Sequence, residues 1–104
     1  MNEKDITAVI TSFKSENKIQ NCIKSLGKEI KIIVVENSND NKLKQKIENE
    51  NSNLKCILSE KNLGYAKGNN LGLSFVKTQF ALIINPDAEI QSDTIKNFLL
   101  TAQV

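Results

Sequence analysis

Histidine and arginine are both absent from this chain of 104 residues, and cysteine occurs only twice. Without histidine, the chain cannot build a Ser–His–Asp or Cys–His nucleophilic site or a zinc site that uses imidazole. Two cysteines are too few for an all-cysteine zinc site. Cys22 and Cys56 lie in apolar settings, so we expect them to be buried free thiols. Without arginine there is no bidentate fork for phosphate or guanine, and a net charge of +2 predicts no nucleic-acid partner.

Long hydrophobic runs are also missing. No apolar stretch approaches the roughly 18–20 residues that cross a bilayer, and the polar start, Met1 to Asp5, is unlike a signal peptide. We therefore expect a cytoplasmic protein with no transmembrane segment, and a full-length form could lie at the inner membrane surface. Four glycines and one proline, nowhere clustered, leave no visible linker. Residues 1–104 are thus predicted to form a single domain.

Four short apolar segments predict β-strands: Ile6 to Ser12, Ile30 to Glu36, Leu54 to Leu58 and Phe80 to Ile84. The second is nearly all β-branched and apolar, which is typical of a central parallel strand buried on both faces. The fourth is expected to end before Pro86, because proline cannot donate to a strand ladder.

Apolar residues at helical spacing lie between and after these strands. Helices are predicted over 19–26, through Leu43 and Ile47, in the later part of Gly64 to Lys77, and over 92–102. Ser15 and Gly27 are expected to begin and stop the first helix, and Asp40 to cap the second. Alternating strands and helices predict an α/β fold, with a mostly parallel four-stranded sheet and helices on both faces.

Polar residues follow each predicted strand, where a parallel sheet places its ligand crevice. Asp87 follows an apolar strand and a proline; it is either a turn residue or, with Glu89, an oxygen ligand for Mg²⁺ or Mn²⁺. Gly64, Gly68 and Gly72 recur every fourth residue. They indicate either close packing of a helix on the sheet or bare backbone that a ligand approaches.

Two familiar α/β sites fit poorly. The turn after the first strand, Thr11 to Lys14, holds no glycine, so it lacks the dinucleotide-binding G-x-G-x-x-G pattern, and no Walker loop is present. A phosphoacceptor receiver domain needs acidic residues that are missing after the first strand, and Glu36 is a poor substitute for its aspartate.

Four segments carry a family resemblance: I-T-A-V-I-T-S-F-K-S-E, I-I-V-V-E-N-S-N-D, N-L-G-Y-A-K-G-N-N-L-G and A-L-I-I-N-P-D-A-E-I. In their order and spacing they resemble the serial motifs of family 2 glycosyltransferases of the GT-A fold, over nearly the whole chain. N-P-D in place of D-x-D resembles the bacterial rhamnosyltransferase-like group. The resemblance implies sugar transfer from a nucleoside diphosphate donor to a hydroxyl acceptor, with inversion, in cell-surface polysaccharide biosynthesis.

The resemblance also assigns site residues. It places Thr11, Phe13 and Glu16 at the nucleotide base, Glu36 against the nucleoside, and Asn62, Gly64 and Asn70 in the segment that closes over the donor. It implies a divalent cation, Mn²⁺ or Mg²⁺, held by Asp87 with Asn85 and Glu89. The cation would neutralise charge on the nucleoside diphosphate leaving group.

Two features depart from the family pattern. Glu36 stands where aspartate is usual, and the chain stops one helix after N-P-D, before the half that binds the acceptor and supplies the general base. We therefore expect an amino-terminal donor-binding fragment that is inactive alone and forms a homo-oligomer through its uncovered surface. The alternatives are a non-catalytic nucleotide-binding or interaction module with the same half-fold, and an α/β domain with no nucleotide site.

Overall fold

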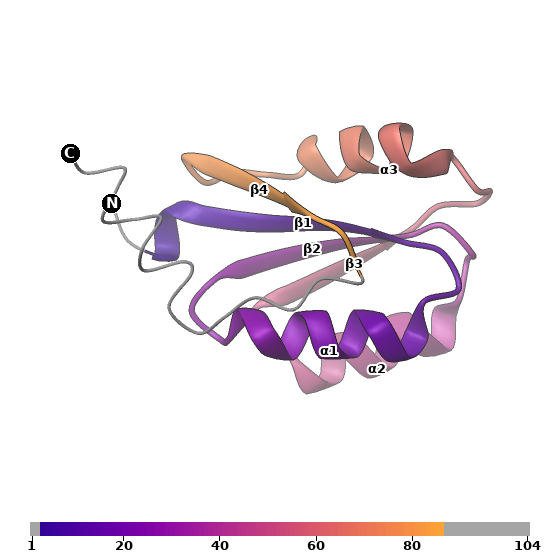
Figure 1. Ribbon diagram of the computed structural model, residues 1–104, viewed down its shortest axis with the longest axis horizontal. Coiled ribbons are helices and arrows are strands. Elements are labelled where there is room, and N and C mark those ends of the chain that lie inside the picture. The colour runs from indigo at the N-terminus through magenta and orange to yellow at the C-terminus, as the bar shows by residue number, and fades with distance from the viewer. Residues whose placement is uncertain (1–2, 87–104) are drawn as a thin grey trace.

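The computed structural model describes residues 3–86 of the chain (Figure 1). A 3₁₀ turn over Glu3–Asp5 is followed by β1 (Ile6–Ser12), α1 (Glu16–Leu26), β2 (Lys31–Glu36), α2 (Asn41–Glu50), β3 (Leu54–Leu58), α3 (Gly64–Leu73) and β4 (Phe80–Ile84). Three of the four predicted strands have the predicted bounds, and the second begins one residue later. The helix predicted over 92–102 lies outside the described residues.

The four strands form one parallel sheet in the order β3-β2-β1-β4. Parallel neighbours need crossover connections, and the intervening helices supply them. Figure 1 shows α1 and α2 on one face of the sheet and α3 on the other. This confirms the predicted α/β fold with helices on both faces.

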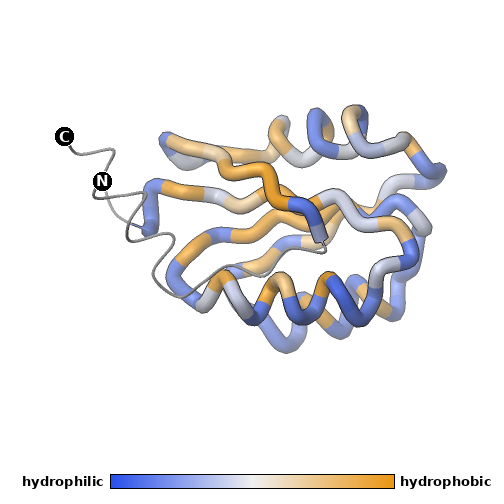
Figure 2. Tube along the Cα trace, in the orientation of Figure 1, coloured by the Kyte–Doolittle hydropathy of each residue, from blue (hydrophilic) through white to orange (hydrophobic). Residues whose placement is uncertain are grey.

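The alternation of side chains along the strands divides the core between these faces. Ile6, Ala8 and Ile10 of β1 belong to one buried cluster with the apolar residues of α1 and α2. Val9 points to the opposite face, toward α3. Burial on both faces explains why β1 and β2 are almost continuous apolar runs. Figure 2 shows the strands as largely hydrophobic segments between amphipathic helices.

Two glycines let α3 lie close against the sheet. A Cβ added to Gly72 would stand 2.6 Å from Cγ1 of Val9, and one added to Gly68 would stand 2.5 Å from Cγ2 of Thr11. Of the two interpretations of the glycine spacing, close packing therefore holds for Gly68 and Gly72. Gly64 differs, because it begins the helix with φ +79° and has open space around its Cα.

We expect Gly72→Ala to lower the free energy of unfolding by about 1–3 kcal/mol, because the added methyl overpacks the contact with Val9. Alanine in a helix ordinarily stabilises by up to about 1 kcal/mol relative to glycine, so the sign of the change is the test. Asn70→Ala, on the exposed side of the same helix, is the control and should stabilise slightly, by about 0.5 kcal/mol, through helix propensity alone. Urea unfolding measures both, and a stabilised Gly72→Ala variant would contradict close packing.

The ends of the helices differ in part from the prediction. The segment after Gly64 is helical in its earlier part, not its later part: α3 ends at Leu73, and the next backbone N–H groups bond back to carbonyls of its last turn. Asp40 caps α2, since its carboxylate accepts from the Leu43 N–H at 3.0 Å. Ser15 stands at the start of α1 but makes no capping bond there; its hydroxyl donates to the Phe13 carbonyl instead.

Both cysteines are buried free thiols, as predicted. Burial raises the pKa of Cys22 to about 11 and that of Cys56 to about 12. Neither thiol is therefore a nucleophile at neutral pH.

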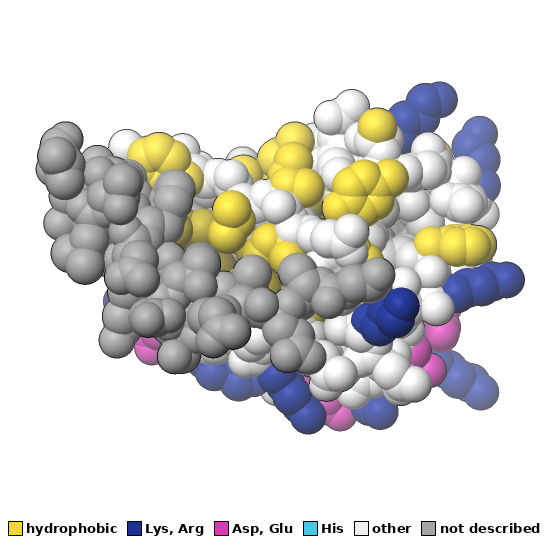
Figure 3. Space-filling model, in the orientation of Figure 1, with side chains coloured by type: hydrophobic (Ala, Val, Ile, Leu, Met, Phe, Trp, Pro, Cys, Tyr) yellow, Lys and Arg dark blue, Asp and Glu magenta, His cyan; other side chains and the backbone are white. Residues whose placement is uncertain are grey.

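Strand β4 keeps apolar side chains at the surface. Ile83 is 46% exposed, and Figure 3 shows hydrophobic side chains on the surface in the upper half of the molecule, where β4 and α3 lie. Apolar surface on an end strand of the described sheet is the feature behind the expected self-association, which stays a prediction.

Candidate functional site

A hollow of about 530 Å³ lies at the carboxyl ends of the strands. The chain leaves β1 toward the face of α1 and leaves β3 toward the face of α3 (Figure 1), so the strand ends stay open between the two helices. Five of the residues assigned from the sequence line this hollow: Thr11, Phe13, Asn62, Gly64 and Asn85. They come from segments up to 74 positions apart in the chain (85 − 11), and the fold brings them together.

The other assigned residues do not line the hollow or lie outside the described part. Glu16 and Asn70 are exposed, on α1 and α3 respectively, and neither lines it. Glu36 is fully buried and does not line the hollow either. Asp87 and Glu89 fall outside the described residues.

The Glu36 carboxylate is engaged by the turn that follows β2. It accepts from the Ser38 N–H at 3.0 Å, the Ser38 hydroxyl at 2.7 Å and the Asp40 N–H at 2.8 Å. These bonds satisfy a carboxylate that is otherwise removed from water, which is the condition for burying one. The contacts seen for Glu36 are therefore those of a residue that shapes the turn.

Asn37, the next residue, does line the hollow. Its side-chain amide donates to the Gly64 carbonyl at 3.2 Å and accepts from the Ser59 hydroxyl at 2.7 Å. Thr11 likewise donates to Asn69 of α3 at 2.6 Å. These polar bonds tie the ends of the strands to α3 and hold the floor of the hollow in place.

All the charged side chains that line the hollow within the described part of the chain are positive. Lys14 and Lys18 line it, and among residues 3–86 no carboxylate does. Lys14 sits in the left-handed region at φ +53°, an uncommon conformation for a residue with a side chain, and its Nζ lies 5.3 Å from the centre of the Phe13 ring. Figure 3 shows lysine side chains around this end of the molecule. The hollow is suited to an anion.

Six lining residues were not assigned from the sequence: Lys14, Ser15, Lys18, Asn37, Tyr65 and Pro86. The alternation along β2 puts Asn37 in phase with Ile33 and Val35, but only the structure shows that the side chains of this phase face α3. The sequence pattern gave no comparable signal for Lys18 or Tyr65.

Two kinds of feature are absent from the part of the chain that the structure describes. Within residues 3–86, no group of three or more His, Cys, Asp or Glu side chains could hold a metal ion. The same part of the chain contains no helix that is long and apolar enough to cross a membrane.

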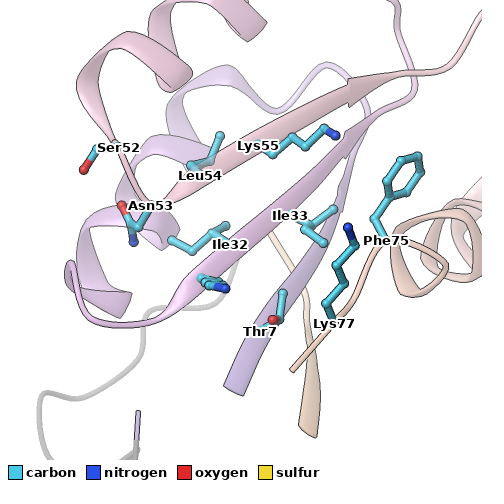
Figure 4. A pocket seen from close by; sticks show the side chains of 10 residues that line it. Thr7, Ile32, Ile33, Ser52, Asn53, Leu54, Lys55, Phe75 and Lys77 are labelled. Atoms are coloured by element: carbon cyan, nitrogen blue, oxygen red, sulfur yellow. The ribbon is translucent and has the colours of Figure 1, made fainter. Parts of the chain in front are cut away.

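A second hollow, of about 380 Å³, lies at the other end of the sheet and is lined by lysines and Phe75 (Figure 4). Lys31, Lys55 and Lys77 surround an apolar floor that includes Ile33, and Lys55 Nζ lies 5.1 Å from the centre of the Phe75 ring. None of the assigned site residues lines this hollow.

Comparison with known proteins assigns the family. The sequence model described as Glycosyl transferase family 2 matches residues 7–103, nearly the whole chain. This chain belongs to glycosyltransferase family 2. The matched range covers the four segments that carried the resemblance, except for the first residue, Ile6.

Among the relatives, the chain is 30% identical over 96 residues to Agl10 of Haloferax volcanii, a low-salt glycan biosynthesis hexosyltransferase, covering 88% of this chain and 31% of Agl10. Crystallised S. aureus TarS (1–349) is 27% identical, with a TM-score of 0.80 over 94% of this chain and 32% of that chain. The mannosyltransferase PcManGT of Pyrobaculum calidifontis, in complex with GDP-Man and Mn²⁺, shares the fold at a TM-score of 0.80 but only 14% identity, over 95% of this chain and 32% of its own. The chain thus spans about a third of the length of these relatives.

Proposed function

We propose that the hollow at the carboxyl ends of the strands binds the nucleoside diphosphate of a sugar donor, as the donor-binding part of an inverting glycosyltransferase. The observation that carries this is the lining itself: two aromatic rings, amide side chains and two lysines, with no carboxylate from residues 3–86. Rings and amides suit a nucleobase, and lysines suit phosphate. The complex of PcManGT with GDP-Man and Mn²⁺ supports the donor class through the shared fold.

The proposed roles follow the lining. Thr11 and Phe13 would contact the base, and Asn62 and Gly64 would close the hollow from the side of α3. Lys14 would add positive charge near the phosphates. This differs from the sequence assignment, because Asn37 takes the place at the hollow that was expected for Glu36, and Glu16 and Asn70 do not line it.

A divalent cation, Mn²⁺ or Mg²⁺, fits this proposal. Asn85 lines the hollow, and it supplies the kind of oxygen donor that hard cations prefer. Asp87 and Glu89, two and four residues later in the sequence, would complete the protein ligands. When bound, the cation would neutralise the charge that develops on the leaving diphosphate. Asp87 would hold it, and Lys14 and Lys18 would add positive charge for the phosphates.

The decisive experiment is calorimetry of UDP and dTDP binding with and without Mn²⁺. In the parent chain we expect Mn²⁺ to tighten binding by about tenfold or more, since each tenfold change corresponds to about 1.4 kcal/mol and the cation neutralises clustered charge. In Asp87→Ala the Mn²⁺ effect should disappear. Glu60→Ala, at an exposed carboxylate, is the matched control and should behave as the parent does.

The same experiment can refute both parts of the proposal. Equal affinity in all conditions would remove Asp87 from the site, and absence of saturable binding in the parent would refute nucleotide binding altogether.

The rhamnosyltransferase-like specificity and the cell-surface polysaccharide pathway belong to the proposal as well, through the N-P-D segment. A non-catalytic nucleotide-binding module is the second candidate, because no carboxylate of residues 3–86 lines the hollow to act as a base.

A further inference from the structure

We propose that Tyr65 stacks on the nucleobase of a nucleotide bound in the hollow, as a second aromatic wall in addition to Phe13. The inference rests on the proposed function for the class of ligand, and it concerns a residue that the sequence motifs did not assign. Tyr65 is 48% exposed and Phe13 is 45% exposed, and both line the same hollow. Half-exposed aromatic rings gathered at one hollow offer apolar surface to a partner.

The two rings come from opposite faces of the sheet. Phe13 belongs to the loop that leads from β1 into α1, and Tyr65 belongs to the first turn of α3. Figure 1 shows that these two helices cover opposite faces and begin at the same end of the molecule. A nucleobase has two π faces, so rings that approach from two sides can cover both of them.

The backbone that carries Tyr65 is held rigidly. The N–H of the preceding Gly64 donates to the Asn62 side chain at 2.9 Å, and the Gly64 carbonyl accepts from Asn37 at 3.2 Å. One turn later, Gly68 packs against Thr11. The backbone of Tyr65 is thus already fixed, so a ligand that binds loses little affinity to the entropy cost of ordering it.

Amide groups lie at the same hollow and can meet the edge of the base. The Asn37 amide uses one of its two donor hydrogens on Gly64 and one acceptor position on Ser59, which leaves capacity of both kinds. Stacking itself tolerates any base, because every base has a π face. We therefore infer that Tyr65 contributes affinity, while the amides contribute the choice of base.

Intrinsic fluorescence tests this directly. Tyr65 is the only tyrosine of the chain, and tryptophan is absent, so tyrosine emission reports this one ring. Titration with UDP should quench the emission in a saturable way, after correction for nucleotide absorbance. Inorganic pyrophosphate, which lacks a base, should leave the emission unchanged.

Variants separate the ring from the rest of the site. Calorimetry of Tyr65→Leu should show about a tenfold loss or more in affinity for UDP, dTDP and GDP alike, in line with the usual effect of removing a stacked ring. Tyr65→Phe should retain the affinity. Phe75→Leu is the matched control, because Phe75 is 38% exposed but lines the other hollow (Figure 4), and it should bind as the parent does.

The outcomes distinguish this inference from the proposed function. If UDP binds by calorimetry while tyrosine emission and the affinity of Tyr65→Leu stay unchanged, the stacking is overturned and nucleotide binding stands. A loss in Tyr65→Leu that Tyr65→Phe does not restore would also overturn stacking, because the phenol hydroxyl would then be the contact. If no nucleotide binds to the parent, both fail together.

Discussion

Glu36→Leu is expected to lower the free energy of unfolding by about 3 kcal/mol, because the substitution leaves three donors of the turn after β2 without their acceptor. The Ser38 N–H, the Ser38 hydroxyl and the Asp40 N–H all bond to this one carboxylate. Glu36 has 0% exposed surface, so water cannot readily replace it. Urea unfolding followed by circular dichroism measures the change.

Two further variants make that test specific. Glu36→Gln keeps the shape and one acceptor oxygen, so we expect a smaller loss, about 1 kcal/mol. It also gives a measurable result if the leucine variant does not fold. Glu29→Leu, at an exposed position, should change stability by less than about 0.5 kcal/mol. Equal stabilities for the Glu36 and Glu29 leucine variants would show that the carboxylate does not hold the turn.

The second large effect concerns catalysis: the 104-residue chain alone is expected to transfer no sugar. Deprotonation of an acceptor hydroxyl by a positioned base contributes about 10²–10⁴ in rate. Histidine is absent from the whole chain, and no carboxylate of residues 3–86 lines the hollow. Glu36 is committed to its turn, and Asp87 and Glu89 are proposed for the cation. Release of UDP or dTDP from nucleotide sugars, with a hydroxyl acceptor present, should therefore stay at the rate without protein.

Calorimetry on the same preparation provides the control, because donor binding without turnover separates a missing base from a misfolded chain. Multiple turnovers that scale with the concentration of the chain would contradict the interpretation of the chain as a donor-binding fragment that is inactive alone. They would also exclude the non-catalytic module.

Much of the fold could be predicted because each strand is a short run of mostly apolar residues. β1, β3 and β4 have the predicted bounds, since each is a short, mostly apolar run that ends at polar turn residues. Of the four strands, β1 and β2 are the ones buried along both faces. The start of α3 was harder to predict. Gly64, with φ +79°, stands where a helix would ordinarily be expected to stop, yet the Asn62 side chain and the Asn37 amide bond to its backbone there and the helix begins.

The candidate site could be predicted only in part for a related reason. Residues at the end of a strand or directly after it, such as Thr11, Phe13 and Asn85, were identifiable because parallel strands bring their carboxyl ends to one end of the sheet. Tyr65 lies seven residues beyond the end of β3, and its place at the hollow depends on how α3 docks. That docking rests on Gly68 and Gly72, whose spacing alone fitted either packing or ligand approach.

The sequence by itself therefore determined the strands, their parallel arrangement and the end of the sheet at which a ligand would bind, because hydropathy, its period and the turn residues are local properties of the chain. Only the tertiary structure decided which of two adjacent polar residues faces the hollow at that end. Glu36 and Asn37 are neighbours in sequence, but successive side chains of a strand point to opposite faces. The Glu36 carboxylate thus meets the turn that leads to α2, while the Asn37 amide meets α3 and the hollow. The physical reason is that alternation only separates the two side chains. Which face of the sheet α3 covers is decided by long-range contacts that the local pattern does not contain.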